Sequence, residues 1–212
     1  MMNGIKFDNT HSYNDLNLIL STVVIPPAMP RILLVDIPGG DGSVDLTESL
    51  GEVKFQDREC KFTFTVLPTD NFEQKKTEIS NFLNGRRCNI VVDKDPDYYW
   101  TGRCYVDEYA SNKKINKIVV GAVVAPYKLK KQETIVIVPA GDSVTVALSN
   151  GRRKVVPTIT NTAAATIVFG NAEYNLSAGT HKLLNIELVQ GDNIVTVTST
   201  EDVRFAYQEG DL

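Results

Sequence analysis

Apolar and polar residues alternate along much of this chain, and a period of two restricts those segments to β-strands. The clearest run covers residues 60–66, where a cysteine, two phenylalanines and a valine alternate with lysine and threonine. A weaker run of the same kind covers residues 44–48. Helices in such a chain have to come from other segments, so the pattern predicts a mainly β fold.

A glycine-rich turn precedes this strand-like sequence. Gly39, Gly40 and Gly42 surround Asp41. Glycine tolerates positive φ and Asp-Gly is a common turn dipeptide, so we expect the chain to reverse sharply here. A phosphate-binding loop would need Gly-x-x-x-x-Gly-Lys-Ser/Thr or Gly-x-Gly-x-x-Gly between a strand and a helix. Strand-like sequence follows instead, which favours a structural turn over nucleotide binding.

The length of 212 residues allows one large or two small domains with a buried core. Hydrophobic residues make up 42% and charged residues 23%, as in a typical globular protein. No apolar run approaches a membrane span, and the N-terminus lacks the apolar stretch of a signal peptide. We therefore expect neither membrane insertion nor export by the usual route.

The net charge of −4 is unevenly distributed along the chain. Residues 1–131 contain 17 basic and 17 acidic residues, whereas residues 132–212 contain 5 basic and 9 acidic residues. Neither half has the basic excess of a nucleic-acid-binding protein. Acidic surface repels DNA, so this charge suits a channel for DNA better than a DNA-binding protein.

Residues that carry catalysis or bind metals are scarce. The two histidines, His11 and His181, lie near no nucleophile signature. The three cysteines, Cys60, Cys88 and Cys104, contain no Cys-x-x-Cys pair, which favours buried free thiols over a disulfide or metal site. We expect no catalytic residues, no metal site and no cofactor, so the chain is not predicted to be an enzyme.

Three aspartates, Asp93, Asp95 and Asp97, form the one carboxylate cluster that invites a catalytic or calcium interpretation. A glycosidase needs two carboxylates that face each other across a cleft. An EF-hand needs spaced oxygen ligands and a trailing glutamate. Adjacent aspartates beside a proline are more typical of a solvated turn.

One helix is predicted near residues 70–84. Thr69 or Asp70 is placed to cap it, and Glu73 is placed for a capping box. Gly85 suits the position just after its end. Its apolar residues fall on one face at helical spacing: Phe72, Ile79, Phe82 and Leu83.

The sequence changes in character near residue 131, and we predict two domains, 1–131 and 132–212. The first is a β-rich domain with the one helix. Within it, residues 23–30 contain three prolines and are expected to form an extended connector, and residues 52–56 are expected to form a strand. In the second, turns arrive about every ten residues, which is typical of a β-sandwich of short antiparallel strands. The strands expected there cover residues 134–138, 143–148, 155–160, 166–169, 181–188, 193–199 and 204–207.

Large aromatic residues cluster in one predicted strand of the first domain. They are Tyr98, Tyr99, Trp100, Tyr105 and Tyr109. Alternation places Tyr99 on the face opposite Tyr98 and Trp100. Tyrosine and tryptophan are enriched at subunit interfaces, so we expect core packing or an oligomer interface rather than stacking on sugars.

Six segments together carry a resemblance to a known family. They are residues 7–16 (FDNTHSYNDL), 37–46 (IPGGDGSVDL), 58–64 (RECKFTF), 157–160 (PTIT), 191–197 (GDNIVTV) and 205–212 (FAYQEGDL). In this order and spacing they resemble the distal tail proteins (Dit) of long-tailed bacteriophages. Where family members often carry a basic residue between the turn glycines, this chain has Gly40.

The resemblance implies a β-rich N-terminal domain that assembles into a six-subunit ring, and a C-terminal antiparallel β-sandwich similar to galectins. It implies a structural protein of the virion tail tip, made in the host bacterial cytoplasm from a phage or prophage gene. The ring would join the tail tube protein to the baseplate hub or lysin protein, with a receptor-binding protein nearby. The genome would pass through the ring without specific binding.

Two other functions stay open at this level. The sandwich would make the chain a host-saccharide-binding adhesin if it held sugars, but its large rings are only Phe169, Tyr174, Phe205 and Tyr207. A wall-degrading enzyme is the third interpretation, and the two distant histidines argue against it. Glycan binding and cell-wall turnover distinguish these functions from a structural ring.

Overall fold

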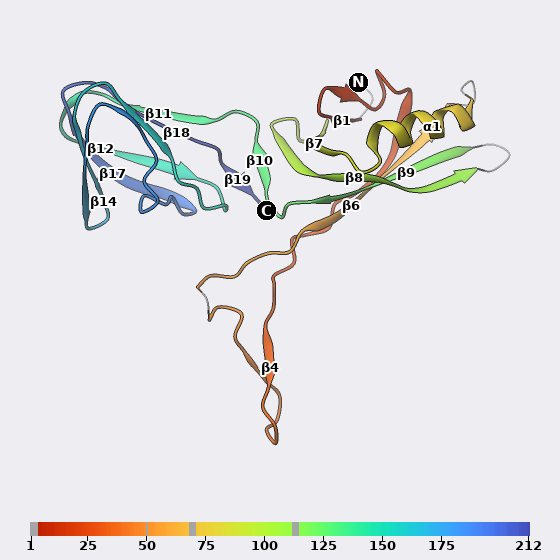
Figure 1. The fold of residues 1–212 in the computed structure, drawn as a ribbon, viewed down its shortest axis with the longest axis horizontal. Coiled ribbons are helices and arrows are strands. Elements are labelled where there is room, and N and C mark those ends of the chain that lie inside the picture. The colour runs from red at the N-terminus through yellow and green to blue at the C-terminus, as the bar shows by residue number, and fades with distance from the viewer. Residues whose placement is uncertain (1–3, 50, 68–70, 112–114) are drawn as a thin grey trace. The chain divides into compact units, whose positions relative to one another are not determined.

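The computed structural model describes residues 4–49, 51–67, 71–111 and 115–212. The chain divides into two compact units, Met1–Pro126 and Tyr127–Leu212. Strands dominate both units, and the described residues contain one helix (Figure 1). The mainly β fold predicted from the alternating pattern is therefore confirmed.

Most strands of the first unit belong to one antiparallel sheet. Its elements, with the hairpin β4–β5 that lies outside the sheet, are β1 (Ile5–Phe7), β2 (Thr10–His11), β3 (Leu18–Val24), β4 (Leu34–Asp36), β5 (Ser43–Asp45), β6 (Arg58–Val66), α1 (Phe72–Leu83), β7 (Arg87–Val92), β8 (Tyr98–Ser111) and β9 (Asn116–Val124). The sheet order is β2-β1-β7-β8-β9-β6-β3. Three of the six neighbouring pairs, β1–β7, β9–β6 and β6–β3, join strands that are not consecutive in the chain, so the sheet brings together segments from the whole unit.

Strand β6 shows how alternation builds the core of this unit. Cys60, Phe62, Phe64 and Val66 are buried, while the residues between them are exposed or half-buried. The ring of Phe7 meets those of Phe62 and Phe64 edge-on, with centroids 6.2 and 6.4 Å apart. Complete burial of one such side chain stabilises the fold by about 1.5–3 kcal/mol.

Helix α1 lies where the sequence predicts it, but its cap differs. The side chain of Asn71 accepts hydrogen bonds from the main-chain N–H groups of Glu73 and Gln74. The expected cap residues, Thr69 and Asp70, lie outside the described residues. Because Asn71 is the cap, Glu73 stands one position too early for a capping box, and it pairs with Lys76 instead.

The structure explains both the apolar face of the helix and its C-terminal end. Ile79 and Leu83 are buried in the core, and Phe72 and Phe82 pack against it. Gly85 follows the helix at a φ of +80°, as expected for a residue that terminates a helix.

The segment before the hairpin departs from the sequence prediction. Val23 and Val24, expected to begin an extended connector, are the last residues of strand β3. Strand β3 is an edge strand of the sheet, and the prolines follow it, so they interrupt no ladder. Residues 52–56, expected to form a strand, contribute only an isolated bridge between Phe55 and Pro30.

The second unit contains two four-stranded antiparallel sheets, β11-β18-β13-β16 and β12-β17-β14-β15. A further strand pair, β10–β19, joins the beginning and end of the unit. The elements are β10 (Lys128–Lys130), β11 (Thr134–Val138), β12 (Gly141–Asn150), β13 (Thr158–Asn161), β14 (Ala165–Phe169), β15 (Ala172–Leu176), β16 (Gly179–His181), β17 (Gly191–Ser199), β18 (Val203–Tyr207) and β19 (Gly210–Asp211). Inward side chains from both sheets form one buried cluster, which is the arrangement of a β-sandwich.

Two predictions for the sandwich are wrong. Residues 181–188, expected to form one strand, leave the sheet after His181 and make only the bridge between Leu188 and Val155. No strand is predicted from the sequence at the residues that form β15. It forms a hairpin with β14 in which Phe169 pairs with Ala172, and the turn uses Gly170 at a φ of +61°.

Candidate interaction surface

The hairpin β4–β5 carries the largest group of exposed apolar residues in the described chain. We call residues 32–49 the hairpin arm. Figure 1 shows β4 in a long excursion between β3 and β6, outside the main sheet. All six residues of the two paired strands are exposed. An isolated two-stranded hairpin is marginally stable in water, so this segment needs a further contact.

The register of the arm separates its two faces. Val35 pairs with Val44, and the main-chain N–H of Leu46 bonds to the carbonyl of Leu33 at 2.8 Å. Because side chains alternate between faces, most of the exposed apolar residues of the arm lie on one side of the ribbon. This apolar face consists of Leu33, Val35, Ile37, Val44 and Leu46. The opposite face carries Leu34, Asp36, Ser43 and Asp45.

The predicted glycine turn lies at the tip of this arm. Gly39 has a φ of +79° and Gly42 a φ of +75°, so both occupy conformations that favour glycine. The N–H of Gly40 bonds to the carbonyl of Ile37 at 3.0 Å, with ordinary φ. Asp41 stands between these glycines on the exposed tip. The turn therefore reverses the chain and connects β4 to β5.

The hairpin arm is acidic. It contains Asp36, Asp41, Asp45 and Glu48 and no lysine or arginine. The hydroxyl and the N–H of Thr47 donate to Asp45 and lower the pKa of that carboxyl. The arm therefore combines an apolar face with a charge of −4 at neutral pH.

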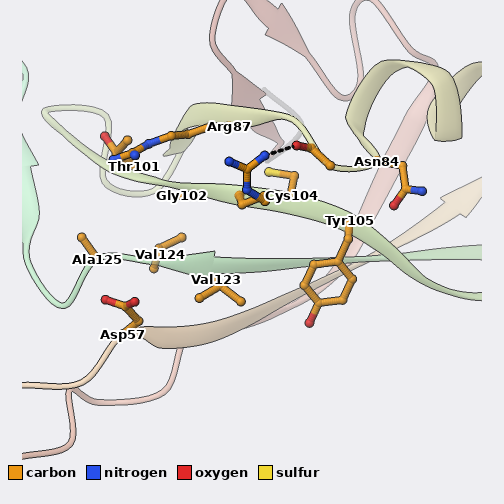
Figure 2. Close-up of a pocket in the computed structure, with 12 residues that line it drawn as sticks. Asp57, Asn84, Arg87, Thr101, Gly102, Cys104, Tyr105, Val123, Val124 and Ala125 are labelled. Atoms are coloured by element: carbon orange, nitrogen blue, oxygen red, sulfur yellow. Dashed lines mark hydrogen bonds between the residues drawn. The ribbon is translucent and has the colours of Figure 1, made fainter.

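A groove of about 560 Å³ lies on the sheet of the same unit (Figure 2). It is formed by the end of α1 and by parts of β7, β8 and β9. Its lining carries two guanidinium groups, Arg87 and Arg103, and one carboxylate, Asp57, so its net charge is positive. Tyr105 and Val123 supply apolar surface, and Val123 is 37% exposed.

Glycine at position 102 lets β8 and β9 approach closely beneath this groove. A Cβ atom at Gly102 would lie 2.2 Å from the carbonyl oxygen of Val123 and 2.7 Å from the Cα of Val124. Both are main-chain atoms, which cannot swing away. The shape of the groove therefore depends on a residue without a side chain.

The five aromatic residues of β8 occupy different environments. Trp100 is 7% exposed and belongs to the core, while Tyr98 and Tyr99 are half-buried. Tyr105 lines the groove and covers Gly121, where an added Cβ would lie 2.3 Å from its ring. The structure thus brings only one of the five to the groove.

Tyr109 attaches the helix to the sheet. Its hydroxyl bonds to the Ser80 hydroxyl and donates to the carbonyl of Lys76 at 3.1 Å. The ring of Phe72 meets it edge-on at 6.5 Å, and the ammonium of Lys76 lies 5.4 Å from its centroid. These contacts within one chain position α1 against β8.

The cysteines and histidines serve local structure. Cys60, Cys88 and Cys104 are buried free thiols, and burial raises the pKa of Cys60 to about 11. The sulfur atoms of Cys88 and Cys104 lie 3.1 Å apart. At His11, Nδ1 accepts the N–H of Tyr13, so Nε2 carries the proton and donates to Asp93 at 3.1 Å.

His181 also has a local partner, since its Nε2 lies 2.8 Å from the carbonyl of Ser177. Within the described ranges, no three His, Cys, Asp or Glu residues lie close enough to hold a metal ion. In the same ranges, no helix has the length and apolar character needed to cross a membrane.

Comparison with family models and with curated proteins finds no match. Among solved structures, the chain is similar to the Dit protein of phage SPP1, with a TM-score of 0.70 and 14% sequence identity. The match covers 98% of this chain and 99% of that one. The SPP1 protein is described as a paradigm of the hub adsorption apparatus in phages that infect Gram-positive bacteria. The chain therefore has the fold of a phage Dit protein, as the sequence resemblance predicts.

Proposed function

We propose that this chain is a structural protein of a phage tail tip, where six copies form a closed ring. The ring joins the tail tube to the baseplate hub and leaves a passage for the genome. One observation carries the proposal: a Dit structure matches both units of the chain from end to end. A match confined to one unit would be compatible with many functions, since folds are shared widely.

The exposed surface of the first unit supports an assembled state. Monomeric soluble proteins rarely expose large contiguous apolar patches, and such patches commonly mark interaction sites. The hairpin arm is such a patch, because its apolar face is uncovered along both strands. Both histidines make local hydrogen bonds and all three cysteines are buried. These environments are consistent with a role in assembly and not in catalysis.

The proposal is tested by the mass and shape of the purified chain. Light scattering should give six times the single-chain mass of 23.4 kDa, and negative-stain images should show rings with a central opening. The measurement should be repeated with the tail tube and hub proteins of the same phage, because ring closure can require a partner. A single-chain mass under both conditions contradicts the proposal.

Sugar binding by the C-terminal sandwich, and its similarity to galectins, stay predictions. A glycan array probed with the full chain tests sugar binding directly. Saturable binding to one class of saccharide would add host recognition to the structural function, and no signal would leave the ring proposal unaffected.

A further inference from the structure

Two cysteines of the first unit form a buried pair of thiols. Cys88 in β7 is 3% exposed, and Cys104 in β8 is completely buried. Their Sγ atoms lie 3.1 Å apart, although the two residues stand 16 positions apart in the chain. Since the two sulfur atoms of a disulfide are about 2.0 Å apart, they need to approach each other by only about 1 Å to form a bond.

The register of β7 and β8 explains why these two side chains meet. Cys88 pairs with Gly102, which has no side chain to fill the space opposite it. The main-chain N–H of Cys104 donates to the carbonyl of Arg86 at 2.7 Å, so Cys104 lies just beyond the beginning of β7. Both thiols belong to the same buried cluster, on one face of the sheet. The fold therefore holds them side by side without strain on either strand.

The third cysteine lies out of reach of this pair. Cys60 of β6 and Cys104 of β8 both pair with Ala122 of β9, from opposite sides. Two strand spacings separate their backbones by about 10 Å, whereas bridged cysteines need Cα atoms closer than about 7 Å. Cys60 is therefore an internal control for the chemistry of the other two.

The two sulfur atoms of the pair differ in reactivity. The S–H of Cys104 donates to the sulfur of Cys88, which lowers the pKa of Cys88 and raises the pKa of Cys104. The thiolate is the reactive form of cysteine, so Cys88 is the attacking sulfur. Cys104 also contributes to the lining of the groove in Figure 2, which brings solvent close to the pair. A reagent of the size of hydrogen peroxide has the shortest path from this side.

We propose that Cys88 and Cys104 are an oxidisable pair, which a hydroperoxide converts into a disulfide that links β7 to β8. The Cys88 thiolate attacks one oxygen of hydrogen peroxide, the O–O bond breaks, and Cys88 becomes a sulfenic acid while hydroxide leaves as water. The Cys104 sulfur then displaces the hydroxyl group from Cys88, and its own proton leaves with that hydroxyl as a second water. The two thiols lose two electrons and two protons in all, and they reduce one peroxide to two waters.

The timing of this bond rests on the proposed function, although the bond itself does not. The cytoplasm keeps thiols reduced, and disulfides form and persist in oxidising surroundings outside cells. A tail-tip protein is made inside the host and acts outside it, so the pair is reduced during assembly and oxidised after release. The N–H of Gly85 donates to the carbonyl of Cys104 at 2.9 Å, so the bond also fixes the chain where it leaves α1.

Counting thiols and mapping peptides test the bond in the purified full chain. The untreated protein should show three free thiols after unfolding, and the peroxide-treated protein only that of Cys60, with a mass lower by about 2 Da. Trypsin cuts after Arg87 and Arg103, which places Cys88 and Cys104 on different peptides. These peptides should stay joined until dithiothreitol is added. Three remaining thiols, or a link that includes Cys60, would overturn the inference.

Three alanine variants show whether the bond stabilises the first unit. Oxidation should raise the melting temperature of the wild type and of Cys60→Ala by roughly 5–10 °C, as expected when a bond closes a loop of about 16 residues. Cys88→Ala and Cys104→Ala should show no such rise. Trp100 fluorescence follows the transition, and circular dichroism verifies that each variant is folded. An equal rise in Cys104→Ala contradicts the inference, and the peptide map of the wild type decides the matter if a variant does not fold.

The order of the two steps can be tested by trapping the sulfenic acid with dimedone. Cys104→Ala should accumulate the adduct at Cys88 during peroxide treatment, because no second thiol displaces the hydroxyl group. Cys88→Ala should give little adduct at Cys104. The opposite pattern would show that Cys88 is not the attacking sulfur.

The outcomes distinguish this inference from the proposed function. If the chain forms rings and its three thiols stay free in peroxide, the inference is wrong and the ring stands. If the Cys88–Cys104 bond forms in a chain that is single under every condition, the oxidisable pair is confirmed and the ring proposal fails.

Discussion

Tyr207 shows how one polar atom is accommodated in the sandwich. The residue is 2% exposed in β18, and its hydroxyl donates a 2.6 Å hydrogen bond to the main-chain oxygen of Ser149. Burial raises the pKa of Tyr207 from 10.0 to about 12, because the phenolate would lose its hydration. The folded state therefore prefers the neutral phenol more strongly than the unfolded state does.

Tyr207 allows us to predict how the free energy of unfolding falls at alkaline pH. A folded pKa above the unfolded value adds stability that is present below pH 10 and lost as the pH rises to about 12. Tyr207→Phe should lower the free energy of unfolding by about 1 kcal/mol at pH 8, through the lost hydrogen bond. Urea denaturation at pH 8 and pH 11 should show a smaller difference between variant and wild type at pH 11. A constant difference would contradict the assignment.

At the scale of the element, strands β8 and β9 can pair closely because position 102 has no side chain. Gly102 pairs with Val124 in the antiparallel register and leaves no space for a Cβ atom. Pairing of this closeness positions Val123 and Tyr105 at the groove. The strand pair and the groove thus depend on the same residue.

Gly102→Ala should therefore destabilise the first unit by about 1–3 kcal/mol, the usual cost of overpacking a filled site. Gly40→Ala is the matched control, because a Cβ atom there meets only ordinary contacts at 3.5 Å and beyond. Thermal unfolding followed by the fluorescence of Trp100 reports on this unit. Equal melting temperatures for the two variants would show that β8 and β9 can separate at low cost.

How far the sequence predicts an element depends on whether its signal is local. Residues 60–66 alternate strictly, and α1 has helical spacing, so both are located correctly. Residues 181–188 have strand-like composition, yet only tertiary contacts determine that they leave the sheet. The hairpin β14–β15 does have a local signal in Gly170-Asn171, a two-residue turn between apolar runs, although the strands expected of the sequence do not include β15.

The candidate site was less predictable than the strands. The sequence marks the turn through Gly39 and Gly42, but the apolar face of the arm emerges only from the pairing of Val35 with Val44. The groove draws residues from segments up to 68 positions apart, from Asp57 to Ala125. No spacing rule connects such residues, because sheet order and not chain order makes them neighbours.

At the scale of the whole molecule, each unit has its own buried hydrophobic cluster. The second unit begins with β10, which pairs with β19 near the C-terminus. Lys130 and Glu209 form an ion pair at 2.8 Å across this pair, and Gln208 donates to the carbonyl of Lys130. We therefore predict that residues 127–212 fold by themselves.

Two fragments test this view. Residues 127–212 should unfold cooperatively, whereas residues 133–212 lack β10 and should lose about 2–4 kcal/mol, because several hydrogen bonds are removed at about 1 kcal/mol each. Urea denaturation monitored by circular dichroism gives both values. Failure of the longer fragment to unfold cooperatively would show that the sandwich depends on the first unit.

The β10–β19 pair also has a consequence for the evolution of this protein. Lys128 lies opposite Asp211, so the chain enters and leaves the sandwich at neighbouring points. Domains whose ends meet in this way tolerate insertion into, and removal from, unrelated chains. A single recombination event could exchange this sandwich for another while the groove and arm of the first unit keep their sequence. The sequence of the second unit can then vary between related proteins while the sequence of the first unit stays the same.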